Sequence, residues 1–132
     1  MAAGRGTVWA GRVVSAIPAL ILATAGVFKI VGGITHAPEL ARNWTHFGYP
    51  VTQLLPIGVV ELGCAIVYAV PRTSVLGAIL VTGYLGGAIA THVRIGELVW
   101  IAPLLLAVLA WLGLFLRDPR LRALLPLRSP GA

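Results

Sequence analysis

The chain has 132 residues, of which 58% are hydrophobic and only 11% are charged, and its mean hydropathy is +0.94. An ordinary soluble domain carries about 25% charged residues, so this composition argues against a water-soluble globule. The net charge of +6 could indicate nucleic-acid binding, but the ten basic residues are not gathered on one helix, and we expect no nucleic-acid partner. The single cysteine, Cys64, excludes an intramolecular dithiol pair.

Four apolar stretches are each long enough to cross the roughly 30 Å hydrocarbon core of a bilayer as a helix. They are predicted over residues 13–33, 51–70, 74–91 and 98–116. The connections between them are short, so no soluble catalytic domain fits beside them. The sequence therefore predicts a single membrane domain over residues 1–132, folded as an all-α transmembrane four-helix bundle in the lipid bilayer.

The first apolar stretch has an alternative interpretation as a cleaved signal peptide. Arg5 and Arg12 form a basic leader, and Ala23-Thr24-Ala25 has the pattern of a cleavage site. The apolar run continues past that site for the length of a full span. We therefore favour an uncleaved helix.

The connection between the first two spans is long enough to have structure of its own. Pro38 suits a first helical turn, and Leu40, Trp44 and Phe47 recur at i, i+4 and i+7. This pattern predicts a short amphipathic interfacial helix at the membrane surface, ended by Gly48-Tyr49-Pro50.

The distribution of basic residues predicts the orientation of the bundle. Cytoplasmic loops carry the excess of Lys and Arg. Seven of the ten basic residues fall on one side, and the tail over residues 117–132 holds four of them: Arg5, Arg12, Arg72, Arg117, Arg120, Arg122 and Arg128. We therefore expect cytoplasmic N- and C-termini, location in the plasma (inner) membrane, and a tail that lies on the anionic leaflet.

Ionisable side chains inside a span cost about 2.5–3.5 kcal/mol each, so each requires a partner, water or a path to the interface. Four are found: Lys29, Glu61, His92 and Arg94. Glu61 lies about ten residues into its span, too deep to reach water unaided, so it either pairs or is protonated. Lys29 either extends to the interface or pairs with Glu61, because the first two spans form an antiparallel hairpin.

Glu61 shares its helix face with Gly58, Ala65 and Tyr68, a face of mostly small residues that favours close packing against a neighbour. Two interpretations of Glu61 stay open. It ties helices together through hydrogen bonds, or it is a functional acid or base, as intramembrane ionisable groups often are.

The third span contains the densest pattern of small residues. Gly83 and Gly87 form a GxxxG motif, which predicts that this helix is the central one of the bundle. Tyr84, Ala88 and His92 lie at i, i+4 and i+8, with a small residue between a phenol and an imidazole. That space could hold a ligand, or the two polar groups could satisfy each other or bind water.

Histidines on the predicted outer side raise the question of a metal site. His36, His46 and His92 could converge with Glu61, but they lack a tight ligand spacing such as HExxH, and we predict no metal site. His92 and Arg94 could also be merely interfacial, with Arg94 and Glu97 forming a solvated pair of little energetic value.

These motifs resemble the DoxX-like family of small four-helix membrane proteins from about Val14 to Pro126. The matching stretches are Gly26-Val-Phe-Lys29, His46-Phe-Gly-Tyr-Pro50, Gly58-Val-Val-Glu61-Leu, the segment over residues 71–94 that ends in His92-Val-Arg94, and Leu116-Arg-Asp-Pro-Arg-Leu-Arg122. The resemblance implies a four-helix bundle whose polar site matches this chain at five positions: Lys29, Glu61, Tyr84, His92 and Arg94.

The resemblance implies no single function. Some relatives look like subunits of thiosulfate:quinone oxidoreductase, or companions of superoxide dismutase and a sulfurtransferase. Others look like assembly factors or chaperones for membrane proteins. Transfer of one reaction to this chain is therefore an analogy at the level of the fold.

Three functions stay open. The first is a redox-associated protein that holds a quinone or another lipophilic molecule, without a covalently bound cofactor, and receives electrons from a membrane or peripheral redox partner. The second is non-redox acid-base catalysis, such as isomerisation or cyclisation of a lipophilic metabolite. The third is an assembly or scaffold subunit, and a homo-oligomer is compatible with all three.

The candidate residues follow from these hypotheses. In the first, Glu61 and His92 move protons, and Lys29 or Arg94 holds anionic oxygens. The candidate catalytic residues are Glu61, His92 and Lys29, and the candidate substrate-binding residues are Tyr84, Arg94, Tyr68 and His46.

Overall fold

A computed structural model describes residues 3–131, and within that range the chain is helical and contains no strand. Four helical segments are long and apolar enough to cross a membrane, which confirms the predicted all-α four-helix membrane architecture. The α-helices are α1 (Arg5–Thr35), α2 (Pro38–His46), α3 (Leu54–Ala69), α4 (Ser74–Arg94), α5 (Ile101–Arg117) and α6 (Pro119–Leu124), and short 3-10 turns at Val51–Gln53 and Leu98–Trp100 lead into α3 and α5.

The first long helix starts earlier than the predicted range. It begins at Arg5 and has 31 residues, which corresponds to roughly 46 Å at the helical rise. That length exceeds the hydrocarbon thickness, so part of the helix extends beyond the apolar core. The helix ends where His36 adopts a left-handed conformation (φ 53°) and its backbone N–H donates to the Gly32 carbonyl.

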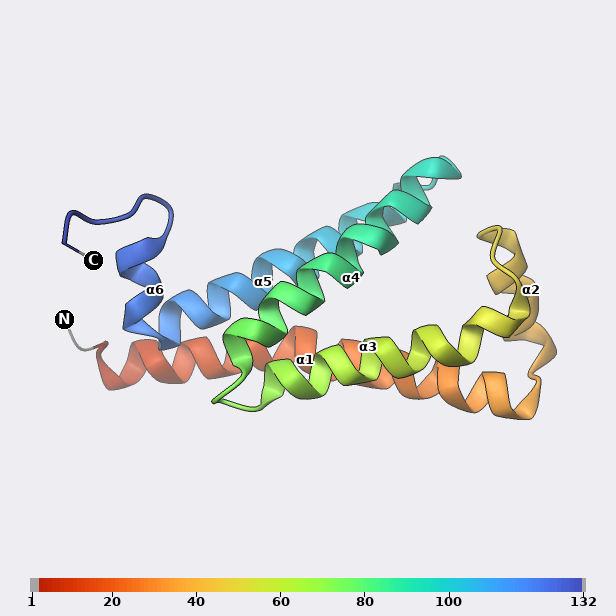
Figure 1. The fold of residues 1–132 in the computed structure, drawn as a ribbon, viewed down its shortest axis with the longest axis horizontal. Helices are drawn as coiled ribbons and strands as arrows, with labels where there is room; N and C mark the ends of the chain where they lie inside the picture. Colours follow the sequence, from red (N-terminus) through yellow and green to blue (C-terminus); the bar gives the residue numbers. More distant parts are fainter. Residues whose placement is uncertain (1–2, 132) are drawn as a thin grey trace.

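The four long helices form two antiparallel pairs that diverge (Figure 1). Helices α1 and α3 lie side by side, as do α4 and α5. The pairs meet at the end that contains both termini, α6 and the α3–α4 turn, which we call the closed half. They separate toward the end that contains α2 and the α4–α5 turn, the open half. Since α1 contacts α3 and α5, and α4 contacts the same two helices, the arrangement is a ring.

Glycines allow the closest helix contacts. A Cβ added at Gly77 in α4 would lie 2.3 Å from backbone atoms of Tyr68, and one added at Gly26 in α1 would lie 2.8 Å from the backbone nitrogen of Leu62. Both distances are far below any real contact, so only glycine permits this packing. Close backbone approach of this kind stabilises helix association in lipid, where burial from water supplies no driving force.

The GxxxG motif of α4 does not mediate close packing. A Cβ at Gly83 or Gly87 would meet no atom within 4 Å. The prediction that this helix is the central one is therefore wrong, because the helix whose glycines pack against two neighbours is α1. A small-residue motif permits close approach but requires a complementary surface opposite, and in the open half the helix pairs have already diverged.

The shorter helices lie at opposite ends of the molecule (Figure 1). Helix α2 occupies the connection where an interfacial helix was predicted, starts with Pro38 and buries Trp44. Helix α6 was not predicted as a helix. It begins after Asp118, whose side chain accepts a hydrogen bond from the Arg120 backbone, and it places Leu121 in the core.

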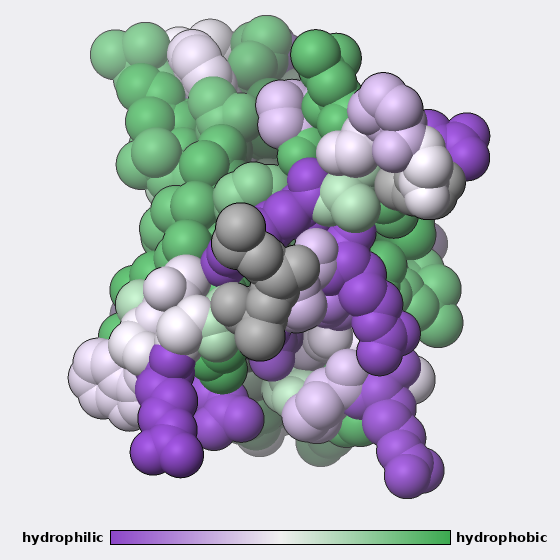
Figure 2. Space-filling model, turned by 90° about the vertical axis from the view of Figure 1, so that its left-hand side faces the viewer, coloured by the Kyte–Doolittle hydropathy of each residue, from purple (hydrophilic) through white to green (hydrophobic). Residues whose placement is uncertain are grey.

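The end with both termini is strongly basic. Figure 2 looks onto this end, where hydrophilic residues gather in front of apolar helix flanks. Exposed basic side chains from the start of α1, the α3–α4 turn and the tail belong to this surface: Arg5, Arg12, Arg72 and Arg120. The flanks are apolar and exposed, as at Leu20, Phe28 and Leu105, which suits contact with a lipid bilayer.

Candidate functional site

A cavity of about 540 Å³ lies between the two helix pairs in the open half. All four long helices line it, and α2 contributes Trp44 at the end of the cavity where this helix lies. Most of the wall is apolar. Polar or titratable side chains enter it at six positions: Lys29, Tyr49, Glu61, Tyr84, Thr91 and His92.

An ion pair between α1 and α3 forms one wall of the cavity. The ammonium nitrogen of Lys29 lies 2.5 Å from a carboxylate oxygen of Glu61, and only 20% and 5% of the two side chains are exposed. Gly58, one turn from Glu61, makes room for the stem of Lys29, because a Cβ at this position would lie 2.7 Å from the Lys29 Cβ. The structure thus shows pairing, rather than extension of Lys29 to the interface.

Helix α4 supplies the opposite polar groups. Tyr84 and His92 both line the cavity, as their spacing on one side of the helix predicted. Gly83, Gly87 and Ala88 stand beside them and leave the space that larger side chains would fill. The open face of α4 therefore forms part of the cavity wall.

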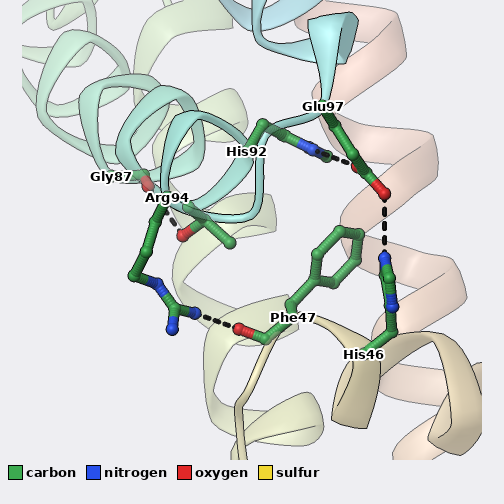
Figure 3. A network of polar contacts seen from close by, with 7 residues as sticks. His46, Phe47, Gly87, His92, Arg94 and Glu97 are labelled. Carbon is green, nitrogen blue, oxygen red and sulfur yellow. Dashed lines mark hydrogen bonds and ion pairs between the residues drawn. The ribbon is translucent and has the colours of Figure 1, made fainter.

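A polar network lies at the end of the cavity next to the α4–α5 turn, which we call the mouth, and Figure 3 shows its contacts. Glu97, in the turn before α5, accepts from two histidines: its carboxylate oxygens lie 2.9 Å from His46 Nε2 and 3.0 Å from His92 Nδ1. The Arg94 guanidinium donates to the Phe47 carbonyl, and the Phe47 ring meets His92 edge-on at 5.1 Å. These contacts attach the end of α2 to α4 and to the following turn.

Glu97 has a more specific role than the sequence analysis gave it. It pairs with two histidines and not with Arg94, and the hydrogen bonds from His46 and then His92 hold the pKa of its carboxyl below the ordinary value. The signal that could have revealed this is Gly96, whose positive φ of 76° lets the chain turn back at the end of α4. The Glu97 backbone N–H then donates to the His92 carbonyl.

Not all predicted site residues come together. Lys29, Glu61, Tyr84 and His92 share the cavity, while His46 and Arg94 belong to the network at its mouth. Tyr68 lies elsewhere, in the closed half, where it is 1% exposed and its hydroxyl donates to the Ala110 carbonyl at 2.7 Å. Its helix spacing from Glu61 misled the assignment, because i and i+7 are two turns, or about 10 Å, apart along the axis.

Three aromatic residues that line the cavity were missed as site residues: Trp44, Phe47 and Tyr49. The Tyr49 hydroxyl lies 3.0 Å from the Thr91 hydroxyl, and its ring stacks on Trp44 with centroids 5.4 Å apart. Trp44 was assigned only to the apolar face of an interfacial helix. Its position over a cavity depends on how α2 docks on the bundle, which the local pattern does not contain.

The described residues contain no group of three or more His, Cys, Asp or Glu side chains that could hold a metal ion. His46 and His92 converge on Glu97 rather than on Glu61, the carboxylate weighed in the sequence analysis.

Four apolar helices around a cavity with a buried ion pair define an integral membrane protein. The chain belongs to the DoxX-like family, whose match covers residues 13–113. A search of curated proteins and a search of solved structures each found no match.

Proposed function

We propose that the protein is a redox-associated membrane subunit that holds a quinone or another lipophilic small molecule in the cavity. The observation that carries the proposal is the buried Lys29–Glu61 pair in the wall of a cavity of about 540 Å³. The volume falls within the usual range for small-molecule sites, which are mostly apolar with a few converging polar groups. Charged groups inside a membrane are costly and generally mark function.

The polar side chains suit the head of such a molecule. The Lys29 ammonium and the Tyr84 hydroxyl are hydrogen-bond donors for carbonyl oxygens. Reduction of a quinone to a quinol takes two electrons and two protons. The electrons come from a membrane or peripheral partner, and Glu61 and His92 move the protons.

The network at the mouth supports a route for those protons. The His46 side chain is 61% exposed, Glu97 joins it to His92, and His92 lines the cavity. Each of these three groups can accept and release a proton. The route runs from water at the open end through His46 and Glu97 to His92.

The proposal also includes the orientation of the bundle across the membrane. The basic end of the molecule, with both termini, faces the cytoplasm, and the cavity lies toward the outer face of the plasma membrane. The exposed arginines of that end support this orientation, because cytoplasmic segments carry the excess of basic residues.

Binding of a short-tailed quinone to the purified protein in lipid nanodiscs tests the proposal. We expect Glu61→Gln to weaken binding by about tenfold or more, because the ion pair that positions Lys29 is lost. The matched control is Glu39→Gln, which changes an exposed carboxylate on α2 outside the cavity lining. Absence of binding to the parent protein, or equal binding by both variants, contradicts the proposal.

A second candidate is non-redox acid-base catalysis on a lipophilic metabolite. It is favoured by the presence of three proton-exchanging side chains, Glu61, Tyr84 and His92, in the lining of one cavity. Turnover of a candidate substrate without any electron acceptor, lost in Glu61→Gln and in His92→Ala, would establish it. A parent protein that neither binds nor converts a ligand but co-purifies with another membrane protein, and whose Glu61→Gln variant mainly loses bundle stability, would instead favour the assembly role.

A further inference from the structure

The charges that line the cavity already compensate one another. Lys29 and Glu61 form a neutral pair at 2.5 Å. The other titratable groups in the lining are two phenols, Tyr49 and Tyr84, and His92, whose Nδ1 is bonded to Glu97. Among the described lining residues there is therefore no unpaired cation or anion ready to receive a charged ligand.

A charged head would break the ion pair. A carboxylate bound to Lys29 would leave Glu61, only 5% exposed, without its cation, and an ammonium bound to Glu61 would leave Lys29 unpaired. An unpaired buried charge is strongly unfavourable. An uncharged oxygen does not compete in this way, because the ammonium has three N–H donors and can serve both Glu61 and the ligand.

The lining of the cavity includes exposed residues on α3 and α4. Val60 on α3 and Gly83 on α4 both line the cavity, and both are exposed. Gly83 and Gly87 have open space where a side chain would stand. Helices α3 and α4 diverge from their turn toward the open half (Figure 1).

We propose that the cavity binds the uncharged, oxygen-bearing head of a single-chain amphiphile, whose tail leaves between α3 and α4 along Gly83 and Gly87. The inference rests on the proposed function only in requiring a ligand in the cavity, and it does not require electron transfer. It determines the charge of the ligand head and the path of the tail, which the proposed function leaves open.

A series of probes with one tail and different heads tests the charge selection. Dodecanol, dodecanal, dodecanoate and dodecylammonium compete with a photoreactive alkyl alcohol for the protein in zwitterionic nanodiscs. We expect the alcohol and the aldehyde to compete about tenfold more strongly than the two charged probes. Equal competition by all four, or stronger competition by dodecanoate, overturns the inference.

The outcomes separate this inference from the proposed function. Quinone binding together with equal competition by the four probes overturns only the charge selection. Selective competition by the alcohol and aldehyde without quinone binding overturns only the redox proposal. Binding of neither quinone nor any alkyl probe overturns both.

Three glycines of α4 provide matched variants for the tail path. Gly83, Gly86 and Gly87 all have open space around them, but Gly86 does not line the cavity. We expect Gly83→Leu and Gly87→Leu to weaken dodecanol competition by about tenfold, through loss of the space beside the tail, while Gly86→Leu leaves it unchanged. The photoreactive group, placed on the part of the tail nearest the head, should label the region of Val60. Equal binding by all three variants, or labelling confined to α1 and α5, overturns the proposed path.

Discussion

Along helix α4, the closed and open halves of the bundle use glycine in opposite ways. In the closed half, Gly77 lets the start of α4 touch the backbone of Tyr68, and Gly113 does the same for α5 against Ser15. In the open half, Gly83 and Gly87 touch nothing and instead leave room for a cavity. A glycine-rich helix in a membrane protein is therefore a signal for close packing or for a ligand space, and only its neighbours decide which.

The two halves also differ in what holds the helices together. The closed half has a continuous apolar core that includes Tyr68, Val81 and Leu114. The open half depends on polar contacts at a distance from that core, chiefly Lys29–Glu61 and the Glu97 network. Substitutions in the closed half should therefore affect folding alone, and those in the open half should affect the site, with a loss of stability as well where a buried charge loses its partner.

The largest effect is expected at Gly77. A leucine there would place its Cβ 2.3 Å from the Tyr68 backbone, and we expect Gly77→Leu to destabilise the bundle by roughly 4 kcal/mol or to prevent folding. Gly86→Leu, on the same helix with open space, should change stability by less than about 0.5 kcal/mol. The free energy of unfolding in mild detergent measures both. Similar free energies of unfolding for Gly77→Leu and Gly86→Leu would contradict the close contact between α3 and α4 at Gly77.

The ion pair comes next in size. Lys29→Met leaves the buried Glu61 carboxylate unpaired, and we expect a loss of about 3 kcal/mol in the free energy of unfolding. The double variant Lys29→Met/Glu61→Gln removes both charges, so it should lose about 2 kcal/mol less than the sum of the two single variants. A double-mutant cycle measures this coupling. Strict additivity would mean that the pair contributes nothing in the membrane protein.

A smaller effect is expected at Tyr68, which separates a structural tyrosine from one in the site. Tyr68→Phe removes the hydrogen bond to the Ala110 carbonyl in the closed half and should cost about 1–2 kcal/mol. Ligand binding should be unchanged, because Tyr68 does not line the cavity. Tyr84→Phe is the counterpart, for which we expect weaker binding with little loss of stability. If Tyr68→Phe weakened ligand binding and Tyr84→Phe lowered only stability, Tyr68 and not Tyr84 would be the ligand-binding tyrosine.

The smallest effect concerns pH and the attachment of α2. The folded-state pKa of Glu97 lies below the ordinary 4.5. The contribution of its carboxylate to the attachment of α2 is therefore present above pH 4.5 and is lost as the pH falls through the lowered pKa. Spin labels at position 42 on α2 and position 90 on α4, in a Cys64→Ser background, report the attachment of α2. We expect the distribution of distances between them to broaden in that acidic window. Glu97→Gln should remove the pH dependence. An unchanged acid transition in that variant would assign it to another group.

Much of the site could be predicted because a bilayer makes ionisable groups conspicuous. Lys29 and Glu61 stood out as charges inside apolar runs, and the hairpin between their helices brought them within reach. Tyr84 and His92 followed from helical periodicity alone. Tyr68 shared the same kind of face but lies in the closed half, where it bonds to the distant Ala110 carbonyl. Glu97 was assigned to the wrong partner, because it bonds to His46 of a distant segment and, across the Gly96 turn, to His92.

By itself, the sequence determined the four apolar helices, the interfacial helix before the second span and the presence of buried charges. The physical reason is that bilayer thickness and the cost of burying charge act on each segment separately. Only the tertiary structure decided which glycines pack and which stay open, and that α2 attaches to the α4–α5 turn through Glu97. Those features depend on the angle at which the two helix pairs diverge, which results from all the contacts of the bundle together.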